Sequence, residues 1–289
     1  MGRRPLCQRR AFCEGQHPAF STRDRGLVAN VSGTGISLVK TGSVGELVLN
    51  RPLTHNAISR AMWRKIPALL GEAQSDPNLR SLIVHGGEAA AFSAGANIAE
   101  LSAMADDPAA AQAFFHDMSI ALETLVAFPK PVIARIKGPC IGAGMALAMA
   151  CDIRIAAKDA RFGVTPAKLG LVYPLADTRR LVALIGPARA KDLIFSARLI
   201  GADEALRLGL IEHIVGKAEL AAFTRNYVHK LGERSAHTQN AMKTMINTLC
   251  DHDPVLALQS RDVFVESFSG KDFHEGFAAF AQKRNPDFS

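Results

Sequence analysis

The sequence lacks the features that mark membrane, disulfide-stabilised and zinc proteins. None of its apolar runs approaches the roughly twenty residues that a membrane-spanning helix needs. The five cysteines are odd in number, widely scattered and without CxxC spacing, which argues against a disulfide framework and favours a reducing compartment. The nine histidines form neither an HExxH motif nor a cluster with cysteine, so we predict no metal site.

Aromatic residues are also scarce, at 6% of the chain, with one tryptophan and two tyrosines. No basic stripe is interleaved with aromatic residues as single-stranded nucleic acids require, so we expect no nucleic-acid partner. The net charge of +7 comes largely from the first 25 residues, which hold six arginines and two acids. The remaining 28 basic and 25 acidic residues leave the body at +3, which suits an anionic small substrate.

The basic N-terminal segment, residues 1–34, has two interpretations. It is poor in acids and broken by proline and glycine, which fits either the disordered leader of a cytoplasmic protein or a transit peptide for the mitochondrial matrix. It lacks the clear apolar periodicity of an amphipathic helix, which weakens the second interpretation. We therefore predict a cytoplasmic protein with a disordered leader.

From residue 35 the sequence alternates between strand-like and helical patterns, which predicts a layered α/β core over residues 35–200. Strands are expected at residues 36–40, 45–50, 81–85 and 131–136. Past Gly186 the pattern is almost wholly helical with little strand signal, which predicts a helical C-terminal region over residues 201–289.

Two helices of the core have clear start signals. Ser59 is a candidate N-cap for a helix that contains Pro67, which should kink it. Asp107 and Pro108 form a cap and a first-turn proline for a long helix that ends near Phe128. These signals are local, so they predict the helices independently of the fold.

Two glycine-containing loops, residues 94–97 and 138–144, each follow a buried strand and precede a helix. Each would present free backbone N–H groups at a helix N-terminus, and two such donors that converge on one oxygen would form an oxyanion hole. Tight turns alone would also explain the glycines. A dinucleotide-binding fingerprint in the second loop is rejected, because Leu147 stands where glycine or alanine is needed.

Three segments in order carry a resemblance to a known family: "AFSAGANIAEL" (91–101), "PKPVIARIKGPCIGAGMALAMACDIRIA" (129–156) and "EGFAAFAQKRNPDF" (275–288). Together they resemble the enoyl-CoA hydratase/isomerase, or crotonase, superfamily from about Gly35 to the end of the chain. The resemblance implies a spiral of ββα units with a helical C-terminal trimerisation region. It further implies an acyl-CoA substrate, no cofactor beyond the CoA moiety, and a homotrimer or a dimer of trimers.

The resemblance also places functional residues. The thioester-oxygen donors fall on the backbone N–H groups of Ala96 and Ala143, which would stabilise an enolate. The positions that contact CoA, some of them across a subunit interface, are Ala94, Ile98, Phe264, Phe280 and Lys283.

The chain departs from a hydratase at the two positions where that family places glutamates. These positions hold Ala146 and Pro166, neither of which can move a proton. What remains nearby is Thr165 and Tyr173, in a loop similar to that of the methylmalonyl-CoA decarboxylase branch. That branch differs at the first oxyanion loop, where it carries histidine in AGHDI against Ala96 here, and it keeps a glutamate where Ala146 stands.

Three functions follow. The first expectation is decarboxylation of a malonyl-type thioester, which needs an oxyanion hole but no base and no activated water. The second is an enoyl-CoA hydratase or isomerase that uses Asp177 or Tyr173, although Asp177 could instead cap a helix starting at Thr178. The third is a CoA-binding paralogue without turnover. Asp152 is expected to have a structural role.

Overall fold

The computed structural model describes residues 33–104, 107–251, 271–284 and 286–288. The predicted leader lies almost entirely outside these residues and stays a prediction. The first half of the fold comprises β1 (Ile36–Thr41), β2 (Val44–Leu49), the 3₁₀ turn η1 (Pro52–Thr54), α1 (Arg60–Gln74), β3 (Ser81–His85), α2 (Ile98–Ala103), α3 (Pro108–Val126), β4 (Val132–Ile136), β5 (Pro139–Ile141) and α4 (Ala143–Met149).

The second half continues with β6 (Ile153–Ala157), β7 (Arg161–Gly163), the 3₁₀ turn η2 (Pro166–Leu169), α5 (Leu175–Ile185), α6 (Pro187–Ser196), β8 (Ile200–Gly201), α7 (Ala202–Leu208), β9 (His213–Val215), α8 (Leu220–Gly232), α9 (Ala236–Asp251) and α11 (Lys271–Gln282). Helices and strands alternate through most of this order, so the predicted α/β class is confirmed.

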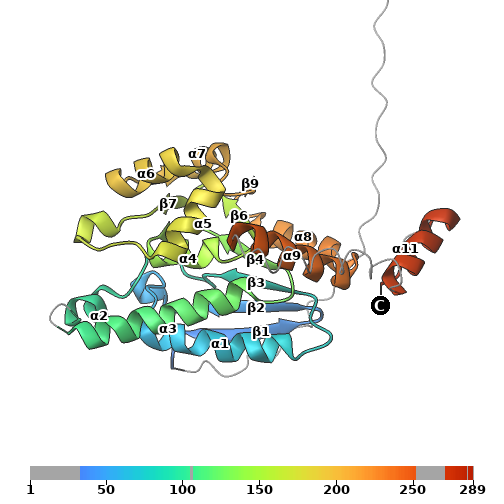
Figure 1. Ribbon diagram of the computed structural model, residues 1–289, viewed down its shortest axis with the longest axis horizontal. Coiled ribbons are helices and arrows are strands. Elements are labelled where there is room, and N and C mark those ends of the chain that lie inside the picture. The colour runs from blue at the N-terminus through green and yellow to red at the C-terminus, as the bar shows by residue number, and fades with distance from the viewer. Residues whose placement is uncertain (1–32, 105–106, 252–270, 285, 289) are drawn as a thin grey trace, which may run out of the picture.

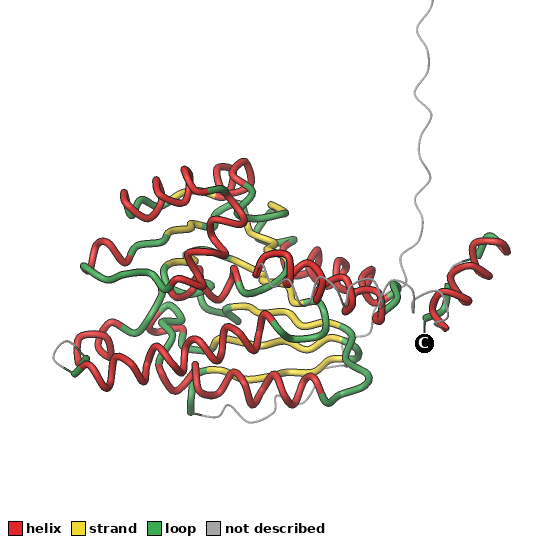
Figure 2. The backbone as a smooth tube through the Cα atoms, viewed as in Figure 1, coloured by secondary structure: helices red, strands yellow, loops and turns green. Residues whose placement is uncertain are grey.

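The strands form two sheets. A six-stranded sheet has the order β1-β2-β3-β4-β6-β9, in which β1 and β2 pair antiparallel and the other neighbours pair in parallel. A three-stranded sheet has the order β5-β7-β8. Figure 2 shows the strands of the larger sheet lying side by side, with helices forming the outer parts of the molecule. Every residue of β3 is buried, as expected for a parallel strand covered on both faces.

The predicted start signals of the core helices are confirmed. The Ser59 side chain accepts a hydrogen bond from the Met62 N–H, and α1 runs unbroken across Pro67. The Asp107 side chain accepts from the Ala110 N–H and begins α3, which ends at Val126, two residues before the predicted end. Helix α1 packs against α3 and β1, which buries Trp63 fully in the main core.

The C-terminal third is less purely helical than predicted. Strand β9 pairs in parallel with β6 and completes one edge of the large sheet, and the two residues of β8 pair with β7. These strands were missed because two or three residues are too short to show alternation. The predicted boundary between residues 200 and 201 falls inside β8, and the two regions stay a prediction.

Candidate active site

The first predicted loop, residues 94–97, is fixed by hydrogen bonds of two buried polar side chains. Asn56, fully buried with a φ of +57°, donates from Nδ2 to the carbonyls of Gly86 and Ala91 at 2.9 and 3.0 Å. Ser93 donates from Oγ to the Asn56 carbonyl at 2.8 Å and accepts from the Gly95 N–H at 3.1 Å. Our sequence reasoning missed both residues; the only signal was a serine placed directly before the glycine loop.

The same loop is also tied to the segment before α1. The Ile58 N–H donates to the Gly95 carbonyl at 2.7 Å, and the Asn97 N–H donates to the Ile58 carbonyl at 3.0 Å. Between these two bonds, the Ala96 N–H has no protein acceptor among the described residues. Asn97 then caps α2 through a bond from the Ala99 N–H to Oδ1. The loop therefore holds one donor free at a fixed place.

The second predicted loop lies directly against the first. The Ser93 N–H donates to the Pro139 carbonyl and the Ile141 N–H donates to the Ser93 carbonyl, both at 3.0 Å. A Cβ atom added to Gly95 would lie 3.1 Å from the Ile141 oxygen and 3.8 Å from the Ala143 nitrogen. One added to Gly144 would lie 2.7 Å from Cβ of Ser93. Glycine at these positions is what lets the two loops approach.

Ala143 is the first residue of α4, after Gly142 in a backbone conformation (φ +53°, ψ −113°) that strongly favours glycine. Its N–H has no protein acceptor within the described residues, as expected for the first turn of a helix. The structure thus brings together the two predicted donors, Ala96 and Ala143, on adjoining loops. Two free N–H groups beside a partly buried surface can stabilise a developing oxyanion.

Thr165 and Tyr173 lie beside the second loop. The Tyr173 hydroxyl donates to the Gly142 carbonyl at 3.1 Å, and a Cβ atom on Gly142 would lie 4.0 Å from Oγ1 of Thr165. Both side chains are partly buried. Burial, together with the negative charge of Asp177, raises the pKa of the Tyr173 phenol well above its usual 10. Tyr173 is therefore a neutral hydroxyl at physiological pH.

Asp177 does not cap a helix that begins at Thr178, so that expectation was wrong. Helix α5 begins at Leu175 after Pro174, which places Asp177 inside the first turn with its side chain 2% exposed. Burial raises the pKa of Asp177 to about 6, Arg180 opposes this from 2.8 Å, and the charge of Glu123 adds to it. Asp177 is thus a buried carboxyl that titrates near neutrality.

The two positions at which the resemblance places the glutamates of a hydratase carry no ionisable group. Ala146 is buried inside α4, and Pro166 begins η2. Asp152 accepts from the Val132 N–H at 2.7 Å and from Nζ of Lys243 at 2.9 Å, which ties β4 to α9. These contacts agree with the structural role expected of Asp152.

The predicted CoA-contacting residues are only partly assembled in one chain. Ala94 and Ile98 are exposed at the first loop and at the start of α2. Phe280 lies in α11 and an exposed Lys283 follows it, while α11 lies far from α2 and α4 (Figure 1). Phe264 lies outside the described residues. Contact of these C-terminal residues with CoA across a subunit interface stays a prediction.

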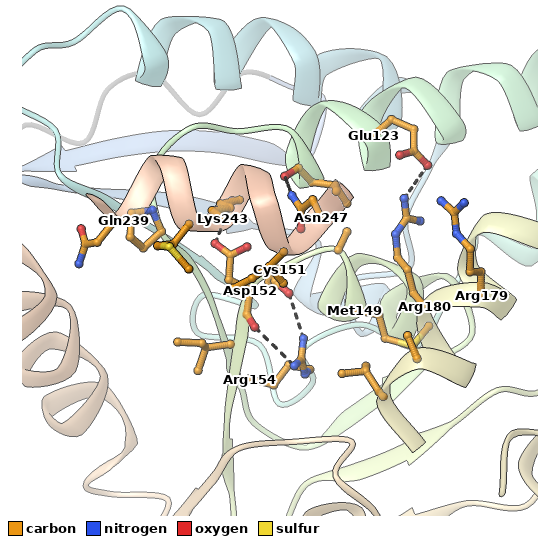
Figure 3. Close-up of a pocket in the computed structure, with 18 of the residues that line it drawn as sticks. Glu123, Met149, Cys151, Asp152, Arg154, Arg179, Arg180, Gln239, Lys243 and Asn247 are labelled. Atoms are coloured by element: carbon orange, nitrogen blue, oxygen red, sulfur yellow. Dashed lines mark hydrogen bonds and ion pairs between the residues drawn. The ribbon is translucent and has the colours of Figure 1, made fainter. Parts of the chain in front are cut away.

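A cavity of about 460 Å³ lies elsewhere, between the C-terminal parts of α3 and α4 and the helices α5 and α9 (Figure 3). Its polar lining includes Arg154, Arg180 and Lys243, which are paired with Glu212, with Asp177 and Glu123, and with Asp152 respectively. Of the predicted site residues that the structure describes, none lines it. Within the described part of the chain, no helix has the length and apolar character needed to cross a membrane.

Comparison with known proteins agrees with this architecture. The family described as enoyl-CoA hydratase/isomerase matches residues 40–289. A short-chain-enoyl-CoA hydratase from Clostridium acetobutylicum is 35% identical over 251 residues, which cover 86% of this chain and 95% of that protein. A crotonyl-CoA hydratase from Syntrophomonas wolfei is 33% identical over 258 residues, 88% of this chain and 97% of that protein.

A solved structure of an enoyl-CoA hydratase/isomerase family protein from Hyphomonas neptunium is also similar. It superposes with a TM-score of 0.85 at 40% sequence identity and covers 88% of this chain and 97% of its own. The fold expected from the resemblance is thereby confirmed. The chain belongs to the enoyl-CoA hydratase/isomerase, or crotonase, superfamily.

Proposed function

We propose that the protein is an acyl-CoA enzyme that stabilises a thioester enolate and carries out hydratase or isomerase chemistry with non-standard acid and base groups. The observation that carries the proposal is the meeting of two loops whose free N–H groups, at Ala96 and Ala143, would bind the thioester oxygen. As negative charge moves to that oxygen, fixed donors stabilise it without reorganisation. The similar proteins that are named as hydratases favour addition of water.

Hydration requires one proton to be removed from water and another to be delivered to the α-carbon. Asp177 is the first candidate for such a group, because a pKa of about 6 allows it to give and take a proton near neutrality. It lies on α5, which packs against α4, the helix that begins at the second loop. Tyr173 is the second candidate. Either one would take the place of the glutamates missing at positions 146 and 166.

Decarboxylation of a malonyl-type thioester is the second candidate function. It is favoured by one observation: the positions of Ala146 and Pro166 hold no carboxylate that would repel the carboxylate of the substrate. The C–C bond to the departing CO₂ would break and leave its electron pair in the same enolate. Thr165 would orient the carboxylate before it leaves, and the α-carbon of the enolate would then take a proton from water. A third function, CoA binding without turnover, needs only the retained fold.

One experiment separates these functions. The purified protein is incubated in turn with crotonyl-CoA, methylmalonyl-CoA and malonyl-CoA, and the thioester mass is followed. A gain of one water on crotonyl-CoA supports hydration, and loss of CO₂ supports decarboxylation. Binding of all three without any product supports the non-catalytic function. If none of the thioesters binds, the acyl-CoA proposal is wrong.

A further inference from the structure

The structure points to a role for Tyr173 that the site's chemistry alone does not suggest. Its hydroxyl proton is directed at a backbone carbonyl, that of Gly142, at 3.1 Å. That carbonyl belongs to the peptide whose other end is the Ala143 N–H, the second oxyanion donor. We propose that Tyr173 is a positioning residue that holds the Gly142–Ala143 peptide in place and thereby strengthens the Ala143 N–H as a donor.

The carbonyl of this peptide is held by a second bond, because it also accepts from the Ala146 N–H at 3.0 Å. The preceding peptide is fixed as well, through the Gly142 N–H, which donates to the Gly163 carbonyl at 2.9 Å. With Tyr173, both lone pairs of the carbonyl are used. The one remaining polar group of this peptide plane is the Ala143 N–H. Hydrogen bonds to a carbonyl polarise the N–H on the far side of the same peptide, so both acceptor bonds increase its donor strength.

The backbone of Gly142 explains why an extra restraint is useful. Gly142 has a φ of +53° and a ψ of −113°, a conformation that strongly favours glycine. Glycine also loses more backbone conformational entropy on folding than any other residue. Two hydrogen bonds to its carbonyl restrict that freedom. The hydrogen bond from the Tyr173 hydroxyl, which comes from another segment of the chain, therefore helps to fix the backbone of Gly142.

The loop that carries Tyr173 is itself well anchored. Pro166 begins the turn η2, and the Leu171 N–H donates to the Pro166 carbonyl at 3.1 Å. On the other side of Tyr173, the Thr178 N–H donates to the Pro174 carbonyl at 2.9 Å. The Tyr173 ring packs against the main core. The proline at position 166 thus shapes the loop that delivers the phenol to the second oxyanion loop.

The same geometry makes Tyr173 unsuited to serve as the acid in the resting enzyme. Its single O–H is donated to Gly142, and only the oxygen lone pairs face other groups. The phenol is neutral, so it has no tendency to act as a base. This inference rests on the proposed acyl-CoA function and narrows it, because proton transfer then falls to Asp177 or to water.

The test uses Tyr173→Phe, with Tyr227→Phe as the matched control. Tyr227 is the only other tyrosine and packs on α8 against a separate core cluster. The probe is acetoacetyl-CoA, a β-keto thioester whose α-carbon ionises to an enolate that absorbs in the ultraviolet. The measured quantity is the apparent pKa of the bound probe, alongside the Kd of butyryl-CoA, a saturated thioester that forms no enolate.

Loss of one neutral hydrogen bond should raise the apparent pKa of the bound β-keto thioester by about 0.5–1 in Tyr173→Phe, on the order of a 3- to 10-fold weaker enolate. The Kd of butyryl-CoA should stay within about twofold, as should both quantities in Tyr227→Phe. If Tyr173 had a purely structural role, the substitution would change the unfolding temperature, the apparent pKa of bound acetoacetyl-CoA and the Kd of butyryl-CoA together. That result would overturn the proposal.

Two other outcomes would also overturn it. In the first, Tyr173→Phe leaves the apparent pKa of bound acetoacetyl-CoA unchanged but greatly lowers the kcat of product formation from an acyl-CoA substrate. Tyr173 would then act directly on the substrate, and the proposed acyl-CoA function would survive. Failure of the unmodified protein to bind either thioester would remove the proposed function and this inference with it.

Discussion

Asp177 provides a prediction whose size can be worked from the structure. The residue is 1% exposed, and burial raises the pKa of its carboxyl from 3.8 to about 6 in spite of Arg180 at 2.8 Å. The difference between these values, at about 1.4 kcal/mol for each tenfold change, corresponds to about 3 kcal/mol. Ionisation of Asp177 in the folded protein is therefore a cost.

The sign follows from linkage. Since the folded state holds the proton more tightly than the unfolded state, the stabilisation is complete below pH 3.8 and is lost as the pH rises through about 6. Asp177→Asn cannot ionise, and its amide can still accept from Arg180. Relative to the unmodified protein, the variant should gain about 3 kcal/mol of unfolding free energy between pH 4 and pH 8.

Urea unfolding of both proteins across this pH range measures the effect. Asp159→Asn is the matched control, because Asp159 pairs with Lys217 at an exposed site where such pairs contribute less than about 1 kcal/mol. A stability difference between Asp177→Asn and the unmodified protein that is independent of pH would refute the reasoning. Product formation from crotonyl-CoA by the same variant tests the acid–base role: a purely structural aspartate would leave kcat unchanged.

Three further predictions concern the loops and their supports. Ala143→Pro removes the second donor N–H at a first-turn position of α4 where proline is tolerated, so the protein should still fold. In a product assay its kcat should fall by about 100- to 1000-fold. An unchanged kcat would mean that this N–H does not bind the reacting oxygen. Gly144→Ala places Cβ 2.7 Å from Cβ of Ser93 and should lower the free energy of unfolding by about 1–3 kcal/mol. The control Gly71→Ala, in open space on α1, should raise the free energy of unfolding by about 0.5–1 kcal/mol. Equal effects of the two substitutions in urea unfolding would contradict the packing argument. Ser59→Ala removes the cap of α1 and should cost about 1 kcal/mol in the same assay, and no cost would show that the bond to Met62 contributes nothing.

The comparison between sequence and structure depends on the range of each interaction. Ser59 and Asp107 were identified because a cap acts on the next three residues, and β3 because its apolar residues 82–84 stand between turn signals. Asp177 was misplaced because Pro174 allows α5 to begin earlier than the polar residues suggest. Strand β9 was missed because three residues are too few to show alternation, and its partner β6 lies about sixty residues away in the sequence.

The sequence by itself determined the α/β class, the caps, the glycine positions of both loops and the absence of glutamate at positions 146 and 166. Only the tertiary structure decided which groups surround Tyr173 and Asp177. The Tyr173 hydroxyl donates to the Gly142 carbonyl, 31 positions earlier in the chain. Asp177 becomes a buried carboxyl only when α5 packs against α4, and the charge of Glu123 on α3 then acts on it. Local patterns report backbone preferences, whereas hydrogen-bond partners and pKa values depend on burial and on neighbours from other segments, which no local pattern contains.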